Sequence, residues 1–197
     1  MRRTIRILAA AALLWLGYVA WPVATFYNLV DAIRARDGVV VARHVNFGAV
    51  RRSLAEQIVV RYLELSGKDA RLGQFSRGMA VAAVMSIADP IVAKLISADA
   101  LIELLRNGWP ASVLPRETTA VPGLGSAAAG NVWQLFVHSE WGLRSFKFTV
   151  PATAPAQRRF GLEFRLTTWR WKLSAIELPE ELRTRLAQEL VKQIDRK

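Results

Sequence analysis

Two side chains have the residue types and the spacing for acid–base chemistry. His138 and Glu140 lie two residues apart in a segment, 133–141, that we predict to be a β-strand, so both would project from one face. In a pocket they could act as the acid–base pair of a small enzyme. A metal site needs a third protein ligand, and the other histidine, His44, is far away in the sequence. We therefore predict no metal and no cofactor, interpret the pair as solvent-facing or hydrogen-bonded, and keep the enzyme as an alternative.

Basic residues form a second candidate site. The chain has 27 lysines and arginines against 16 acidic residues, a net charge of +11. A cationic strand face could bind anionic lipid headgroups, surface polysaccharide or an acidic envelope protein, and the alternative is a solvated face without a ligand. Trp169 and Trp171 alternate with the cations and should face the core, so no nucleic-acid partner is predicted. The cations expected to share the polar face are Lys147, Arg165, Arg170 and Lys172.

Composition limits the protein classes that the chain can represent. The 197 residues correspond to about one domain of roughly 150 residues with an appendage. Hydrophobic residues make up 52% of the chain, with 7 Trp and 8 Phe, so it can bury a core. The absence of cysteine excludes disulfides, thiolate metal sites and thiol catalysis.

The N-terminus carries a membrane signal that sets where any site would lie. Arg2, Arg3 and Arg6 precede an uncharged run from Ile7 to Val30, and a spanning helix needs about 17 to 25 apolar residues. We predict that residues 1–30 are a cytoplasmic arginine cluster and a single-pass signal-anchor in the inner membrane, with the N-terminus in the cytoplasm. A cleaved signal peptide and a buried core helix are the alternatives, although the candidate cleavage sites are poor.

The rest of the chain, 31–197, is predicted to be one extracytoplasmic α+β domain whose helical part is 31–108. After a short apolar piece over 39–45, Asn46 can cap a helix over 47–65. Ser76 can open another helix, and Asp89-Pro90 can cap a new helix that runs toward Ile96. Ser97 or Asp99 can cap the next helix, which ends at Asn107-Gly108.

The second half of this domain changes from helical to strand periodicity. Prolines and glycines over 109–131 predict a loop, and apolar residues then alternate with polar ones over 132–178, which predicts about four antiparallel strands. An amphipathic helix follows over 179–196. Helices packed on one face of an antiparallel sheet define an α+β fold, and a cone-shaped pocket of the cystatin or NTF2 kind is possible.

Three stretches together resemble a bacterial family of short membrane-anchored proteins known as domain of unknown function 2939. The family has no assigned activity, so the resemblance implies architecture and a membrane location and no catalytic residue. One departure is Asn46, where such sequences commonly have aspartate. The stretches run from Trp21-Pro22 to Ser53-Leu54, from Ser97 to Gly108, and from Phe160 through Trp171-Lys172-Leu173 to Leu178-Pro179.

These observations predict a membrane-anchored envelope protein, displayed in the periplasm or outside the cell. We expect a non-enzymatic binding or accessory domain for an envelope lipid, polysaccharide or protein. The alternatives are a small extracytoplasmic enzyme that uses His138 and Glu140, or a protein–protein interaction scaffold whose C-terminal helix docks on a partner.

Overall fold

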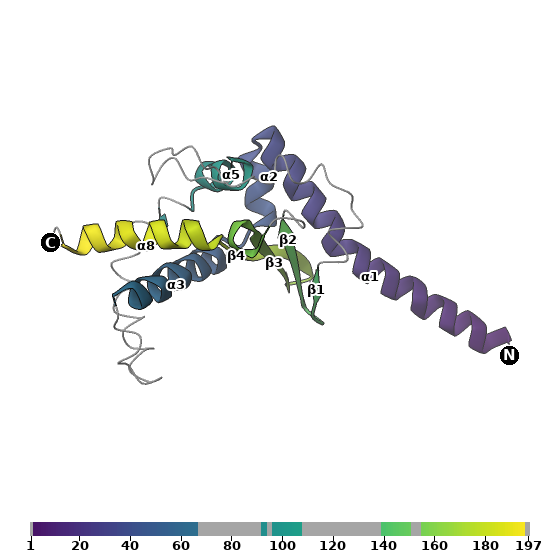
Figure 1. Ribbon diagram of the computed structural model, residues 1–197. Helices are drawn as coiled ribbons and strands as arrows, with labels where there is room; N and C mark the ends of the chain where they lie inside the picture. Colours follow the sequence, from purple (N-terminus) through teal and green to yellow (C-terminus); the bar gives the residue numbers. More distant parts are fainter. Residues whose placement is uncertain (1, 67–91, 94–95, 108–138, 151–154, 196–197) are drawn as a thin grey trace.

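The computed structural model describes residues 2–66, 92–93, 96–107, 139–150 and 155–195 (Figure 1). Three predicted features lie outside the described residues: most of the two helices over 76–96, the loop over 109–131, and His138. The described elements are six helices, α1, α2, α3, η2, α5 and α8, and four strands, β1 to β4.

Helix α1 (Arg2–Ala35) has two halves with different surroundings. Figure 1 shows its N-terminal half extending away from the rest of the chain, and apolar side chains such as Leu8, Leu13 and Trp15 are exposed there. In the C-terminal half, Phe26 and Leu29 are fully buried in the core. The sequence predicts an anchor over residues 1–30, and in the structure α1 side chains are buried from Pro22 onward.

The end of α1 turns the chain into a second helix. Arg36 adopts a left-handed conformation with φ 56°, which ends α1, and the Asp37 N–H donates to the Ala32 carbonyl at 2.9 Å. The Asp37 side chain then accepts hydrogen bonds from the N–H groups of Val39 and Val40 and caps α2 (Gly38–His44). The short apolar piece over 39–45 is therefore mostly helical.

Two predicted helix starts are confirmed by their caps. The Asn46 side chain accepts a hydrogen bond from the Ala49 N–H at the start of α3 (Phe47–Leu65). The Ser97 Oγ accepts from the Ala100 N–H at the start of α5 (Ala98–Asn107), so serine rather than Asp99 is the cap. Asn46 also donates its own N–H to the Leu173 carbonyl at 2.8 Å, which ties the start of α3 to the sheet.

The strands form one antiparallel sheet in the order β1-β2-β3-β4. Three of them are long, and β1 contributes only two residues, so the sheet is essentially three-stranded. A bulge lies where Glu163 pairs with Ala175 but Phe164 pairs with Leu173, leaving Ser174 as the extra residue. The strands are β1 (Glu140–Trp141), β2 (Ser145–Val150), β3 (Phe160–Thr167) and β4 (Arg170–Glu177).

Trp169 corrects one prediction. Thr168 and Trp169 form the β3–β4 turn, with φ 49° and 60°, and Trp169 is 82% exposed. The predicted alternation failed here because β4 begins only at Arg170, so Trp169 belongs to the turn and not to the strand. Trp171 does face inward, at 4% exposed.

The core lies between one face of the sheet and the helices. The Phe26 ring of α1 stacks on Phe148 of β2, with ring centroids 4.5 Å apart, and Phe164 of β3 meets both rings edge-on. Helix α8 (Glu180–Asp195) packs along α3 through Leu182, Leu186 and Leu190, and its start lies near η2 (Ala156–Arg158) (Figure 1). The α+β class is confirmed, and the conical pocket is not.

Candidate functional site

The strand register places the four candidate cations on the polar face of the sheet. Arg165 of β3 lies opposite Lys172 of β4, and Thr167 lies opposite Arg170, one step further toward the turn. Lys147 of β2 lies opposite Glu163, which also belongs to this face. The side chains between them in sequence, such as Phe146 and Phe164, are buried on the other face.

Glutamates on the same face neutralise two of these cations. The Lys147 Nζ lies 2.7 Å from Glu177 Oε2, and the Arg165 Nε lies 2.7 Å from Glu163 Oε1. The hydrogen bond to Glu177 raises the pKa of Lys147 above its usual value, with further help from the charges of Glu177, Glu140 and Glu163. These pairings could not be predicted from the sequence, because they depend on the register between strands.

The remaining positive charge gathers at one end of the sheet. The β1–β2 turn and the β3–β4 turn lie at this end, since the Leu166 N–H donates to the Arg144 carbonyl at 3.0 Å. Within the described residues, Arg144, Arg170 and Lys172 have no ion pair, and the first two are exposed. Leu143, beside Arg144, is 86% exposed, so each turn presents one apolar side chain next to an arginine.

This end of the sheet touches the middle of α1. The Tyr18 hydroxyl donates to the Leu143 carbonyl, and the Tyr18 ring meets the Trp171 ring edge-on with centroids 5.9 Å apart. Figure 1 shows the sheet beside the part of α1 where the helix leaves the folded domain. We call Leu143, Arg144, Trp169 and Arg170 the turn surface.

The predicted acid–base pair is only partly visible. Glu140 lies on β1, opposite Lys147, and is exposed. His138 lies outside the described residues, so the pair stays a prediction. The Nδ1 of His44 lies 2.9 Å from the Val40 carbonyl one turn earlier in α2, which gives this histidine a hydrogen-bonding role within its own helix.

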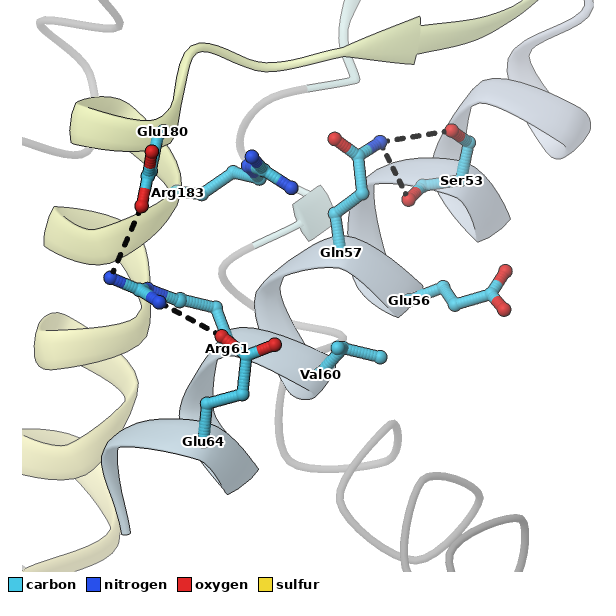
Figure 2. A pocket seen from close by; sticks show the side chains of 8 residues that line it. All are labelled: Ser53, Glu56, Gln57, Val60, Arg61, Glu64, Glu180 and Arg183. Atoms are coloured by element: carbon cyan, nitrogen blue, oxygen red, sulfur yellow. Dashed lines mark hydrogen bonds and ion pairs between the residues drawn. The ribbon is translucent and has the colours of Figure 1, made fainter. Parts of the chain in front are cut away.

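A cleft of about 570 Å³ lies between α3 and α8 and was not predicted from the sequence. Figure 2 shows Arg61 reaching from α3 to the Glu180 carboxylate at the start of α8, and it also pairs with Glu64 at 2.8 Å. The Arg61 Nε donates to the Thr184 hydroxyl at 3.0 Å. Glu56, Glu64 and Glu180 line the cleft, but no group of three potential metal ligands occurs in the described part of the chain. The contacts of Arg61 join two helices.

Gln57, which also lines this cleft, joins α3 to the sheet. Its Nε2 donates to the Ile176 carbonyl at 2.7 Å, and its Oε1 accepts from the Leu178 N–H at 2.9 Å. One side chain therefore satisfies two backbone groups around the end of β4, just before α8 begins. The Arg183 side chain points toward Gln57 in Figure 2, and its buried Nε has no hydrogen-bond partner within the described residues.

Replacing Gln57 by methionine is expected to lower the free energy of unfolding by about 2 kcal/mol, because the Ile176 carbonyl and the Leu178 N–H would both lose their partner. Urea unfolding of the full chain in mild detergent would measure this. Ser53→Ala is the matched control, since it removes only a bond between neighbouring turns of α3 and should cost less than about 0.5 kcal/mol. Equal losses in the two variants would contradict the bridging role of Gln57.

Fold and surface together define a class of protein: an α+β domain joined to one N-terminal helix that is long and apolar enough to cross a membrane. Residues 11–104 match the model of the family described as protein of unknown function DUF2939, which supports the resemblance found in the sequence. The match begins in the first third of α1 and ends within α5, so the sheet lies outside it. No curated protein and no solved structure matches the chain.

Proposed function

We propose that the chain is an inner-membrane envelope protein that is anchored by α1. The support is the difference in burial between the two halves of α1. In the most apolar 18-residue stretch of the helix only 6% of the residues are buried, while the second half of the same helix is in the core. An apolar helix surface that the described part of the chain leaves uncovered favours an apolar environment. A soluble core helix would be covered on at least one side along its whole length.

The proposed orientation places the α+β domain in the periplasm. Arg2, Arg3 and Arg6 precede the apolar segment, and positively charged flanks favour the cytoplasmic side. On the C-terminal side the first cations are Arg34 and Arg36, which lie close to Asp31 and Asp37 and further from the membrane-crossing part of the segment than the three N-terminal arginines do.

The proposed activity of the domain is binding, without catalysis, to anionic lipid headgroups at the membrane surface. The observation that carries it is the position of Arg144, Arg170 and Lys172, which have no ion pair among the described residues, at the end of the sheet that contacts α1. Anionic headgroups lie where α1 enters the bilayer, and each cation near such a surface contributes about 1 kcal/mol. The domain would thus be held at the membrane surface as an accessory envelope protein.

Removing these three cations should weaken this attraction. With Arg144, Arg170 and Lys172 all changed to glutamine, we expect a loss of about 3 kcal/mol, or up to about 100-fold in the population of the surface-bound orientation. The full chain would be placed in nanodiscs of phosphatidylcholine alone or of phosphatidylcholine with phosphatidylglycerol. Hydrogen exchange of peptides that cover the two turns should be slower in the anionic discs, and the variant should lose this difference.

The matched control changes Arg43, Arg52 and Arg158 to glutamine, which removes the same charge from exposed positions on α2, α3 and η2. This variant should keep the slower exchange in anionic discs. Equal exchange of the unmodified chain in both kinds of disc would contradict headgroup binding.

A further inference from the structure

The turn surface also carries two apolar side chains whose exposure the fold does not explain. Leu143 and Trp169 are 86% and 82% exposed, more than any other large hydrophobic residue described in the chain, including those on the N-terminal half of α1. They come from different hairpins but lie at the same end of the sheet. Each one is followed by an arginine, Arg144 or Arg170.

The contact between the turn surface and α1 determines how deep these side chains would lie relative to a membrane that α1 crosses. A helix needs about 17 residues to cross the hydrocarbon core, and counted from Ile7 this crossing ends near Val23. Tyr18 lies before that point, and it contacts both the Leu143 carbonyl and the Trp171 ring. The turn surface is therefore level with the last part of the membrane-crossing segment.

We infer that the two turns dip into the interfacial region of the bilayer next to α1, with Leu143 and Trp169 inserted among the lipids and Arg144 and Arg170 at the headgroups. This inference rests on the proposed function, since it requires α1 to cross the membrane. Tryptophan prefers the membrane interface, and an apolar side chain flanked by cations suits an anionic lipid surface. The sheet and α1 would then contact the membrane together, which determines the orientation of the whole domain.

The chain contains no cysteine, so single cysteines can report depth without a background signal. Leu143→Cys and Trp169→Cys would each carry an environment-sensitive fluorophore, in the full chain reconstituted into nanodiscs of phosphatidylethanolamine and phosphatidylglycerol. We expect quenching by nitroxide-labelled lipids and loss of quenching by acrylamide, a neutral water-soluble quencher. Far-ultraviolet circular dichroism would check that each labelled chain keeps its fold.

Two further positions make the outcome decisive. Val39→Cys is the matched control, because Val39 is also an exposed apolar residue, at 65%, but lies roughly 25–30 Å beyond Tyr18 along α1, so its label should stay in water. Leu13→Cys reports the anchor itself and should be quenched only by the lipid probes. If Leu13 is in lipid while labels at 143 and 169 are as accessible to acrylamide as the label at 39, insertion of the turns is overturned and the anchor stands. If the label at position 13 is in water, α1 does not cross the membrane. This outcome overturns the proposed function, and with it the insertion of the turns that depends on it.

Discussion

Replacing Phe148 by alanine is expected to lower the free energy of unfolding by about 3 to 5 kcal/mol. The Phe148 side chain is buried at the point where the sheet meets α1, and three other aromatic rings surround it. Its ring centroid lies 4.5 Å from that of Phe26, 4.3 Å from that of Phe146 and 5.8 Å from that of Phe164. Truncation would leave a cavity that rigid neighbouring rings cannot fill.

Urea or thermal unfolding of the full chain in mild detergent would measure this loss. Trp169→Ala is the matched control, because it also removes an aromatic side chain from the hairpin region but from an exposed position. In detergent it should change the free energy of unfolding by less than about 0.5 kcal/mol. A loss of similar size in both variants would show that the ring cluster does not hold α1 on the sheet.

Local patterns were sufficient to predict most element boundaries. Asn46 and Ser97 are short polar side chains directly before helical periodicity, and both cap helices as expected. The alternation of Phe146, Phe148 and Val150 with polar residues gave the burial of β2 correctly. In each case the signal lies within a few residues of the feature that it specifies.

The candidate site could be predicted only in part, because its geometry depends on contacts between distant segments. Counting cations identified the basic face, but the pairing of Lys147 with Glu177 is set by two strand registers. The exposure of Trp169 depends on a turn that starts one residue later than the alternation suggests. The bridge from Gln57 to Ile176 and Leu178 joins residues about 120 positions apart, and no local pattern predicts such a contact.

Helix α1 shows a second limit of prediction from sequence, which concerns burial along a single helix. Its apolar run is continuous, so hydropathy alone does not distinguish the exposed side chains of α1 from those that face the core. Burial makes the distinction, since Leu13 is 69% exposed while Leu29 is fully buried. Substitutions in the two halves should therefore have different consequences: loss of membrane attachment in the first half, and loss of folding stability in the second.

The double variant Leu13→Asp, Leu14→Asp is expected to release the chain from the membrane. Aspartate at the centre of a spanning helix costs about 2.5 to 3.5 kcal/mol, so two of them oppose insertion by about 5 to 7 kcal/mol. Both leucines are exposed, at 69% and 77%, so their replacement removes no core contact. Carbonate extraction of membranes from expressing cells would measure the result: the unmodified chain should stay in the membrane pellet, and the variant should move to the supernatant.

Val39→Asp with Leu65→Asp is the matched control for this experiment, because both are exposed apolar residues of the folded domain, on α2 and α3. It adds the same charge and should leave the chain in the pellet. The intact mass of the unmodified chain decides between an anchor and a cleaved signal, because cleavage would remove the residues that hold the protein in the membrane. An inserted apolar helix resists extraction at high pH, whatever the charge of the domain attached to it. If the unmodified chain is uncleaved and carbonate still extracts it as readily as the double variant, anchoring by α1 is contradicted.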